Sequence, residues 1–338
     1  MKHEVDLSKY QIRTDLVIEK TNENFNHSEE KIGNIKITKT NLKTDYIIDN
    51  KKAGTYITIE FDDVTDNENY NKVKYIFEKN LKNLLKETGI TKKDTCLVVG
   101  LGNIDSTPDS IGPLTIQNII VTNHIYLYDE LDPNYRRVSA ITPNVTAVNG
   151  IETSDYIKGI VDILKPDFII VIDALASRSI ERVNKTIQLS NTGITPGSGV
   201  GNNRNEISKN NLGIPVIAIG IPTVVDAVSV VANTIQFIEK HYAFYKDYFQ
   251  KPISKIVPSG QINYIKKNSI PNQKDNEKIL GIIGTLKEDE VRTLISEVLT
   301  PIGYNMIVTP KEVDFVVKKL GNLLSDGINN SLHFKKCN

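Results

Sequence analysis

Two aspartates stand where apolar, β-rich runs of the sequence end. Residues 96–99 (CLVV) are followed by Gly100 and, after a polar turn, by Asp109, whereas residues 168–172 (FIIVI) lead directly into Asp173. An apolar run that stops at a glycine before a helical pattern is typical of a buried parallel strand. Because ligands of open α/β sheets bind beyond the carboxyl ends of the strands, both carboxylates are expected at one crevice.

Two carboxylates in one crevice can hydrolyse a peptide in either of two ways. Because they repel, the pKa of one is expected to rise and that of the other to fall. The ionised group would act as a general base on water, while the protonated one would donate to the scissile carbonyl or the leaving nitrogen. Alternatively, both could hold a divalent metal that activates the water. The competing interpretation is helix capping, or an ion pair to Arg178 or Arg204. The matched placement of the two aspartates favours catalysis.

Other motifs fit established catalytic patterns less well. The GLGN motif at 100–103 lacks the third glycine of a dinucleotide-binding fingerprint, because Asp105 stands there. Ser198 lacks the glycine spacing of a nucleophile elbow. The five histidines form no HExxH motif, which excludes a classical zincin. Asp226 lies in the expected first turn of a helix, where an acidic residue complements the helix dipole.

Residues 193–204 (GITPGSGVGNNR) are the most glycine-dense segment of the sequence. Glycines let a backbone approach an anion or an extended peptide closely. We therefore expect a loop near the site, with Gly197, Ser198 and Gly199 contacting substrate.

The composition excludes several classes of protein. Among 338 residues, 41 Lys and Arg balance 41 Asp and Glu, so no basic field predicts nucleic-acid binding. No apolar run is long enough for a membrane span, and the polar start does not resemble a signal peptide. The two cysteines, Cys96 and Cys337, suit a reducing cytoplasm rather than a disulfide framework. The chain is expected to be a cytoplasmic globular protein.

The order of patterns predicts an α/β fold. Alternating segments between 34 and 61 predict a β-hairpin or meander, and helical spacing is found over 73–85 and 153–164. A strand over 214–219 is followed by an expected helix over 223–242. Residues 242–280, which contain three prolines, predict an irregular excursion.

Six stretches of the chain resemble the spore germination protease family, endopeptidases of spore-forming Gram-positive bacteria that begin the digestion of small acid-soluble spore proteins. The stretches are SKYQIRTDLVIE (8–19), VVGLGN (98–103), TPDSIGP (107–113), VIDALASRS (171–179), TGITPGSGVGNNR (192–204) and VLTPIGYNMIVTPKEVD (298–314). They extend over most of the chain, so chance agreement does not explain them.

The resemblance implies a three-layer α/β/α sandwich with a mostly parallel central sheet, similar to hydrogenase-maturation endopeptidases, with a peripheral β-hairpin and helical additions. The family's essential aspartates fall on Asp109 and Asp173. No cofactor is implied, although the related maturation peptidases hold a metal at the corresponding positions, so a divalent metal stays open.

The resemblance also implies a zymogen that removes its own N-terminal leader, assembles as a homotetramer and works in the spore core, the cytoplasm of the forespore. The leader would be residues 1–15, cut at Asp15–Leu16, and residues 16–338 would form one peptidase domain. Substrates would be cut after an acidic residue and before an apolar one. Arg178 or Arg204 could bind that acidic residue. No direct contact with nucleic acid or membrane is implied.

Two further classes of function compete with a carboxylate-dependent endopeptidase. One is a catalytically silent module that binds spore proteins, which would not require two acids in one crevice. The other is a metal-dependent peptidase or amidohydrolase with the aspartates as ligands. Sensitivity to a chelator would separate this last class from the first.

Overall fold

The computed structural model describes residues 14–19, 26–45, 51–127, 132–197, 204–250, 269, 271–303 and 305–333. The chain divides into two compact units, one drawn from residues 13–224 and 309–338 and the other including residues 225–308. The helices of 225–308 pack on one another, which makes them a compact unit. The single peptidase domain over 16–338 stays a prediction.

The larger unit is built on a mixed sheet with the strand order β1-β2-β3-β7-β8-β6-β4-β5. Strand β4 runs parallel to β5 and β6, whereas β7 runs antiparallel to β3 and β8, and β1, β2 and β3 pair antiparallel. The strands are β1 (Asn26–Ile32), β2 (Ile35–Leu42), β3 (Gly54–Glu60), β4 (Cys96–Gly100), β5 (Val138–Ile141), β6 (Phe168–Ser177), β7 (Thr186–Ser190) and β8 (Val216–Asp226).

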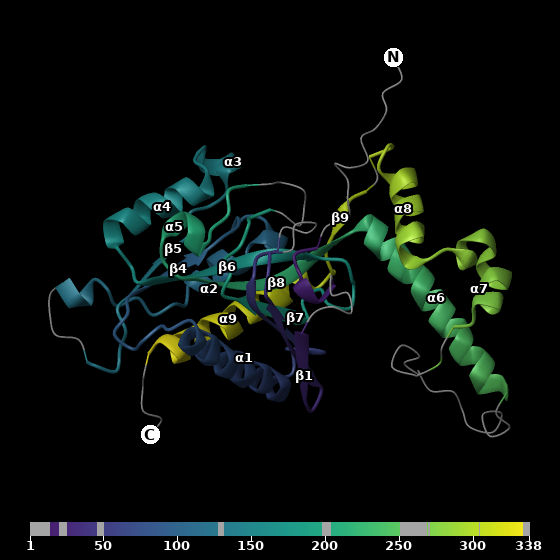
Figure 1. Ribbon diagram of the computed structural model, residues 1–338, viewed down its shortest axis with the longest axis horizontal. Helices are drawn as coiled ribbons and strands as arrows, with labels where there is room; N and C mark the ends of the chain where they lie inside the picture. Colours follow the sequence, from purple (N-terminus) through teal and green to yellow (C-terminus); the bar gives the residue numbers. More distant parts are fainter. Residues whose placement is uncertain are drawn as a thin grey trace, which may run out of the picture. The chain divides into compact units, whose positions relative to one another are not determined.

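Helices cover both faces of this sheet, because successive side chains of a strand point to opposite faces. Val98 and Ile170 pack in one apolar cluster with α1 (Asn67–Glu87) and α9 (Val313–Leu332). Leu97 and Ile169 pack in a second cluster with α4 (Thr153–Leu164). Figure 1 shows α1 and α9 side by side on one face and α4 on the other. The larger unit is thus the three-layer α/β/α arrangement.

Short helices join these layers. They are α2 (Ile111–Ile116), α3 (Thr146–Asn149), α5 (Lys209–Leu212) and 3₁₀ helices at Val17–Glu19, Thr107–Asp109 and Ile125–Leu127. Sequence periodicity predicts the apolar stripe of α1, whose members Val73, Ile76, Phe77, Leu81, Leu84 and Leu85 are all buried. Asp66 caps this helix by accepting a hydrogen bond from the Asn69 N–H at 2.8 Å.

The second unit contains α6 (Ala227–Gln250), α7 (Gln273–Leu280), a 3₁₀ helix at Gly281–Thr285, α8 (Glu288–Leu299) and β9 (Ile307–Val308). Strand β9 pairs with Val225 and Asp226, the last two residues of β8, which belong to this second unit. The buried Arg292 of α8 donates to the Ser229 hydroxyl of α6 at 3.1 Å.

The described ends of the segment 242–280 are helical, whereas residues 251–268 lie outside the described residues, so the irregular excursion stays a prediction there. Helix α6 continues to Gln250, and α7 begins at Gln273. The aromatic residues that suggest irregularity pair one helical turn apart, with ring centroids 4.6 Å apart for His241 and Tyr245 and 5.7 Å apart for Phe244 and Tyr248. Such pairs stabilise a helix. Within the described residues, every helix is too short or too polar to form a membrane-crossing segment.

Candidate active site

Asp109 is presented by a tight loop that follows β4. Its carboxylate oxygen Oδ2 accepts a hydrogen bond from the Asn103 N–H at 2.9 Å. Gly102, the residue before Asn103, has φ of +105°, and a Cβ there would lie 2.0 Å from the carbonyl oxygen of Asp109. The GLGN motif is therefore explained by this close approach. Asp109 does not cap α2, since Ser110 is the capping residue.

A buried threonine of β8 holds the same loop through a hydrogen bond. Thr223, which is fully buried, donates a hydrogen bond from Oγ1 to the carbonyl oxygen of Pro108 at 2.6 Å. In turn, Thr309 donates to the carbonyl oxygen of Thr223 at 2.8 Å. Strand β8 thus fixes the position of the loop that carries Asp109.

Asp173 lies within β6, one residue beyond the point where β4 stops pairing, because Gly100 is opposite Ile172. Its side chain is 7% exposed, and Oδ1 accepts a hydrogen bond from the Ala174 N–H at 2.9 Å. The last residues of β6 extend past the end of β4. This brings Asp173 and Asp109 to the same edge of the parallel part of the sheet, as the sequence predicts.

The two carboxyl groups are electrostatically coupled. Burial raises the pKa of Asp109, and the Asn103 N–H and the charge of Arg204 partly offset that rise. Burial, followed by the negative charges of Asp109 and Asp15, raises the pKa of Asp173 well above its ordinary value. The sequence predicts one raised and one lowered pKa. Both pKa values are raised instead, because burial acts on both groups: Asp173 is almost fully buried, and Asp109 is partly buried.

Residues predicted to contact substrate lie in different places. Arg204 acts electrostatically on both aspartates and donates to the Thr146 hydroxyl at 2.9 Å. The Arg178 N–H donates instead to the Glu19 carboxylate at 2.7 Å. Gly197 has a left-handed φ of +71°, and Ser198 and Gly199 lie outside the described residues.

The predicted leader junction is docked against β6. The Asp15 N–H donates to the carbonyl oxygen of Ala176 at 3.1 Å, and the Asp15 carboxylate accepts from the Ala176 N–H at 2.9 Å. Leu16 is fully buried and Val17 is 3% exposed. An acidic and an apolar residue are therefore held next to β6 at Ala176, which follows Asp173 by three residues.

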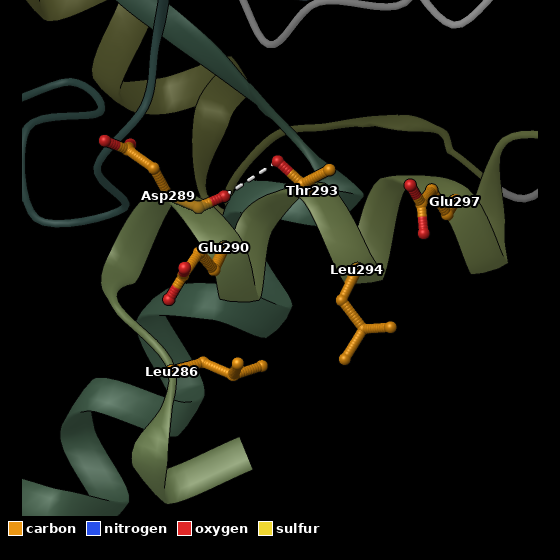
Figure 2. A pocket seen from close by; sticks show the side chains of 6 residues that line it. All are labelled: Leu286, Asp289, Glu290, Thr293, Leu294 and Glu297. Atoms are coloured by element: carbon orange, nitrogen blue, oxygen red, sulfur yellow. Dashed lines mark hydrogen bonds between the residues drawn. The ribbon is translucent and has the colours of Figure 1, made fainter. Parts of the chain in front are cut away.

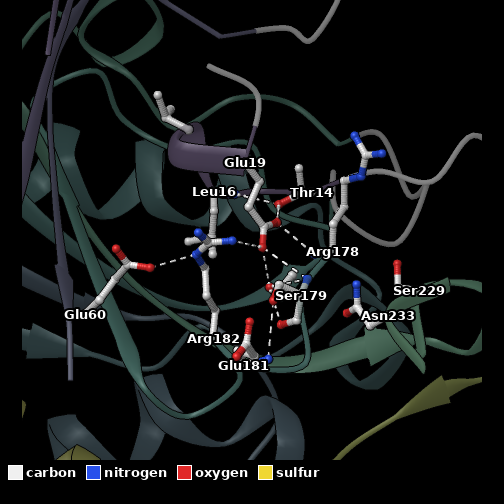
Figure 3. Close-up of polar contacts among 12 residues, drawn as sticks. Thr14, Leu16, Glu19, Glu60, Arg178, Ser179, Glu181, Arg182, Ser229 and Asn233 are labelled. Carbon is white, nitrogen blue, oxygen red and sulfur yellow. Dashed lines mark hydrogen bonds and ion pairs between the residues drawn. The ribbon is translucent and has the colours of Figure 1, made fainter. Parts of the chain in front are cut away.

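Glu19 is a residue of this segment whose role sequence reasoning missed. Its buried carboxylate accepts hydrogen bonds from Ser177 Oγ at 2.6 Å and from the N–H groups of Arg178 and Ser179 at 2.7 and 3.1 Å. Arg182 pairs with it at 3.2 Å and with Glu60 at 2.9 Å. Figure 3 shows these groups converging on Glu19. Glu19 lies more than 150 residues before its partners at 177–182, so no local pattern reveals these contacts.

Asp226 has a structural role. Its Oδ1 accepts a hydrogen bond from the Ser229 N–H at 2.6 Å, as the capping residue of a helix does. This agrees with the interpretation that its charge serves the start of α6.

The described residues include no group of three or more His, Cys, Asp or Glu side chains arranged to hold a metal ion. A surface pocket of about 430 Å³ lies on α8, lined by Leu286, Asp289, Glu290, Thr293, Leu294 and Glu297 (Figure 2). None of the predicted site residues lines it.

The fold and the site define an α/β protein with two coupled carboxyl groups, one buried and one partly buried, beyond the end of β4 in the parallel part of a mixed sheet. The family model described as germination protease matches residues 4–337. The chain belongs to the germination protease family and is a peptidase of that family.

Relatives named germination protease cover almost the whole chain. The one from Bacillus mycoides strain KBAB4 is 46% identical over 98% of this chain and 96% of its own length, and the one from Bacillus cereus strain AH187 is 45% identical over the same shares. Among solved structures, a [NiFe] hydrogenase maturation protease from Thermococcus kodakarensis is 14% identical, with a TM-score of 0.27 over 43% of this chain and 80% of its own. A likeness of that extent carries no argument about activity.

Proposed function

We propose that this chain is an endopeptidase that starts the degradation of small acid-soluble spore proteins during germination, and that Asp109 and Asp173 activate water for peptide hydrolysis. The observation that carries the proposal is the coupling of the carboxyl groups of Asp109, in the loop that follows β4, and Asp173, within β6. Two such groups with unequal pKa values suit a base and an acid in one site.

In this mechanism Asp109 is the general base and Asp173 the general acid. Ionised Asp109 takes a proton from water as the oxygen adds to the scissile carbonyl carbon. Asp173, whose raised pKa favours its protonated form, donates its proton. Because one group accepts a proton while the other donates one, the barrier to hydrolysis falls without a covalent intermediate.

The substrate would be cut after an acidic residue and before an apolar one. The docked pair Asp15–Leu16 supports this preference, because the acidic side chain bonds to β6 and the apolar one is fully buried. Arg204, beside the two aspartates, is our candidate for binding the acidic residue of a substrate, with Arg178 as the alternative. The loop that includes Gly197, Ser198 and Gly199 would grip the main chain of an extended segment.

The enzyme would be made as a zymogen that cuts its own leader at Asp15–Leu16 in the spore core. We also propose that it assembles as a homotetramer. Large apolar side chains that are more than half exposed support an assembly, namely Ile282, Val298, Ile302, Met306 and Ile307. Light scattering of the purified chain would test it, and a monomer would contradict it.

Cleavage of a purified small acid-soluble spore protein tests the proposed substrate and specificity. Leader-free enzyme beginning at Leu16 should yield fragments that mass spectrometry maps to a cut after an acidic residue. Replacing that residue with its amide should slow cleavage, and Arg204→Glu should weaken the preference for an acid. Cleavage at unrelated positions, or an unaltered preference in both arginine variants, Arg178→Glu and Arg204→Glu, would refute the specificity.

A further inference from the structure

The peptide bond between Asp15 and Leu16 is held by side chains from distant parts of the chain. The carbonyl oxygen of Asp15 accepts hydrogen bonds from Lys51 Nζ at 2.8 Å and from Gln188 Nε2 at 3.2 Å. The N–H of Leu16 donates to the Thr14 hydroxyl at 3.0 Å. Both atoms that change charge or protonation when this bond is hydrolysed therefore have partners already in place.

Gln188 spans the junction with a single amide group. While its nitrogen donates to the Asp15 carbonyl, its Oε1 accepts a hydrogen bond from the N–H of Val17 at 2.8 Å. Gln188 is only 9% exposed and lies on β7, where its neighbours are Thr58 of β3 and Gly220 of β8. The sheet thus fixes the amide before any reaction begins, as electrostatic stabilisation of a transition state requires.

The same junction is tied to the strand that carries the proposed acid. Asp15 pairs with Ala176 of β6 through its own N–H and through its carboxylate. Its negative charge contributes to the raised pKa of Asp173. The carbonyl held by Lys51 and Gln188 therefore belongs to a residue that pairs with β6 and acts electrostatically on Asp173, the proposed acid.

We propose that Lys51 and Gln188 polarise the Asp15 carbonyl and stabilise the oxyanion that forms on it during self-cleavage of the leader. This inference rests on the proposed function. A charged ammonium and a fixed amide N–H are the kinds of donor that stabilise a tetrahedral intermediate. Lys51 brings the positive charge, and Gln188 fixes the direction of the carbonyl.

With Lys51 and Gln188 as donors to the oxygen, the nitrogen of Leu16 is the atom that Asp173 would protonate. Water forms a bond to the Asp15 carbonyl carbon, its proton passes to Asp109, and the carbonyl π pair moves onto the oxygen between Lys51 and Gln188. When the pair returns, the carbon–nitrogen bond breaks, and the nitrogen of Leu16 takes the proton of Asp173. Because the oxygen already has two donors, the acid is left for the leaving nitrogen.

Self-cleavage of the full chain tests this assignment. The appearance of the chain that begins at Leu16 is followed by intact mass for the wild type, Lys51→Met and Gln188→Glu. Glutamate keeps the acceptor for Val17 but loses the donor. Removal of one oxyanion donor typically slows a reaction about 10²–10³-fold, and we expect a loss of that order in each variant. Lys51→Arg, which keeps the charge, should recover part of the rate.

Lys52→Met is the matched control, because the Lys52 ammonium lies 3.5 Å from Glu206 and 3.8 Å from Asp45. It should cleave at the wild-type rate. In Lys51→Met the rate should fall by the same factor at every pH, because Asp109 and Asp173 set the shape of the profile. A displaced leader would instead alter hydrogen exchange over residues 14–19, so unchanged exchange is expected.

Wild-type rates in Lys51→Met and Gln188→Glu, or an equal loss in Lys52→Met, would overturn the oxyanion role and leave the proposed function intact. Altered exchange over residues 14–19 in Lys51→Met would overturn it too, by showing that Lys51 only docks the leader. If the wild-type chain never yields the Leu16 terminus, the self-processing proposal fails as well.

Discussion

Replacing Glu19 with alanine tests whether one buried carboxylate holds residues 14–19 in place. Its side chain is 3% exposed and pairs with Arg182 at 3.2 Å. It also accepts hydrogen bonds from the Ser177 hydroxyl and from two backbone N–H groups of the following residues. Alanine would leave these donors without their acceptor in a site with little access to water.

The expected loss follows from these contacts. Breaking a buried ion pair by removing one partner costs about 3–5 kcal/mol. Arg182 is 28% exposed and keeps its contact with Glu60 at 2.9 Å, so part of its charge stays compensated. We therefore expect Glu19→Ala to lower the free energy of unfolding by about 3 kcal/mol, the low end of that range.

Urea unfolding of the full chain measures this loss. Glu29→Ala is the control, because Glu29 pairs with Lys36 at an even shorter 2.7 Å but is 49% exposed. An exposed pair contributes about 0–1 kcal/mol. If the two variants lose the same stability, burial is not what makes the Glu19 contacts strong, and the reasoning is refuted.

Three further changes probe the loop and strand that carry the aspartates. Burial raises the pKa of Asp173, so the contribution of this carboxyl group to stability is present below the ordinary Asp pKa and is lost as pH rises through the pKa of the folded state. Asp173→Asn should therefore be more stable than wild type at neutral pH, and the difference in unfolding free energy should shrink in acid. A difference that grows in acid would contradict this. Gly102→Ala places a Cβ against the Asp109 carbonyl oxygen at a φ of +105°. Thermal unfolding should show that the free energy of unfolding falls by about 1–3 kcal/mol. Wild-type stability would argue against the close approach. Thr223→Val removes the donor to the Pro108 carbonyl, and we expect a loss of about 1–3 kcal/mol by urea unfolding together with slower cleavage; no change in either would show that the contact does not position the loop.

Local patterns predict the elements that carry the aspartates. Continuous apolar runs indicate β4 and the first half of β6, and helical spacing indicates α1 and α4. A ligand crevice at the carboxyl ends of parallel strands then predicts that Asp109 and Asp173 meet. This inference needs only strand direction and the place where each run ends.

Boundaries set by tertiary packing could not be predicted in this way. Glycine and proline suggest that the strand at 214–219 stops before a helix at 223, but β8 continues through Gly220 and Pro222 to Asp226. A Cβ at Gly220 would lie 2.3 Å from Leu175, so this glycine is there for packing between strands rather than for a turn.

The contacts of Lys51, Gln188 and Glu19 are equally invisible in the sequence. Each joins segments that are dozens to more than a hundred residues apart. Isolated polar residues on a strand or loop carry no periodic signal. Only the fold brings them to the leader junction.

The most direct test of the central claim is cleavage of a small acid-soluble spore protein by leader-free Asp109→Asn and Asp173→Asn enzymes, with and without a strong chelator. A general acid or base typically contributes about 10²–10⁴-fold, so each variant should be folded and slower by that order. Asp226→Asn, which alters a helix-capping aspartate, should cleave at the wild-type rate, and the chelator should change nothing. Wild-type cleavage by either site variant would contradict the assignment, and loss of activity on chelation that added metal restores would show that the aspartates act as metal ligands.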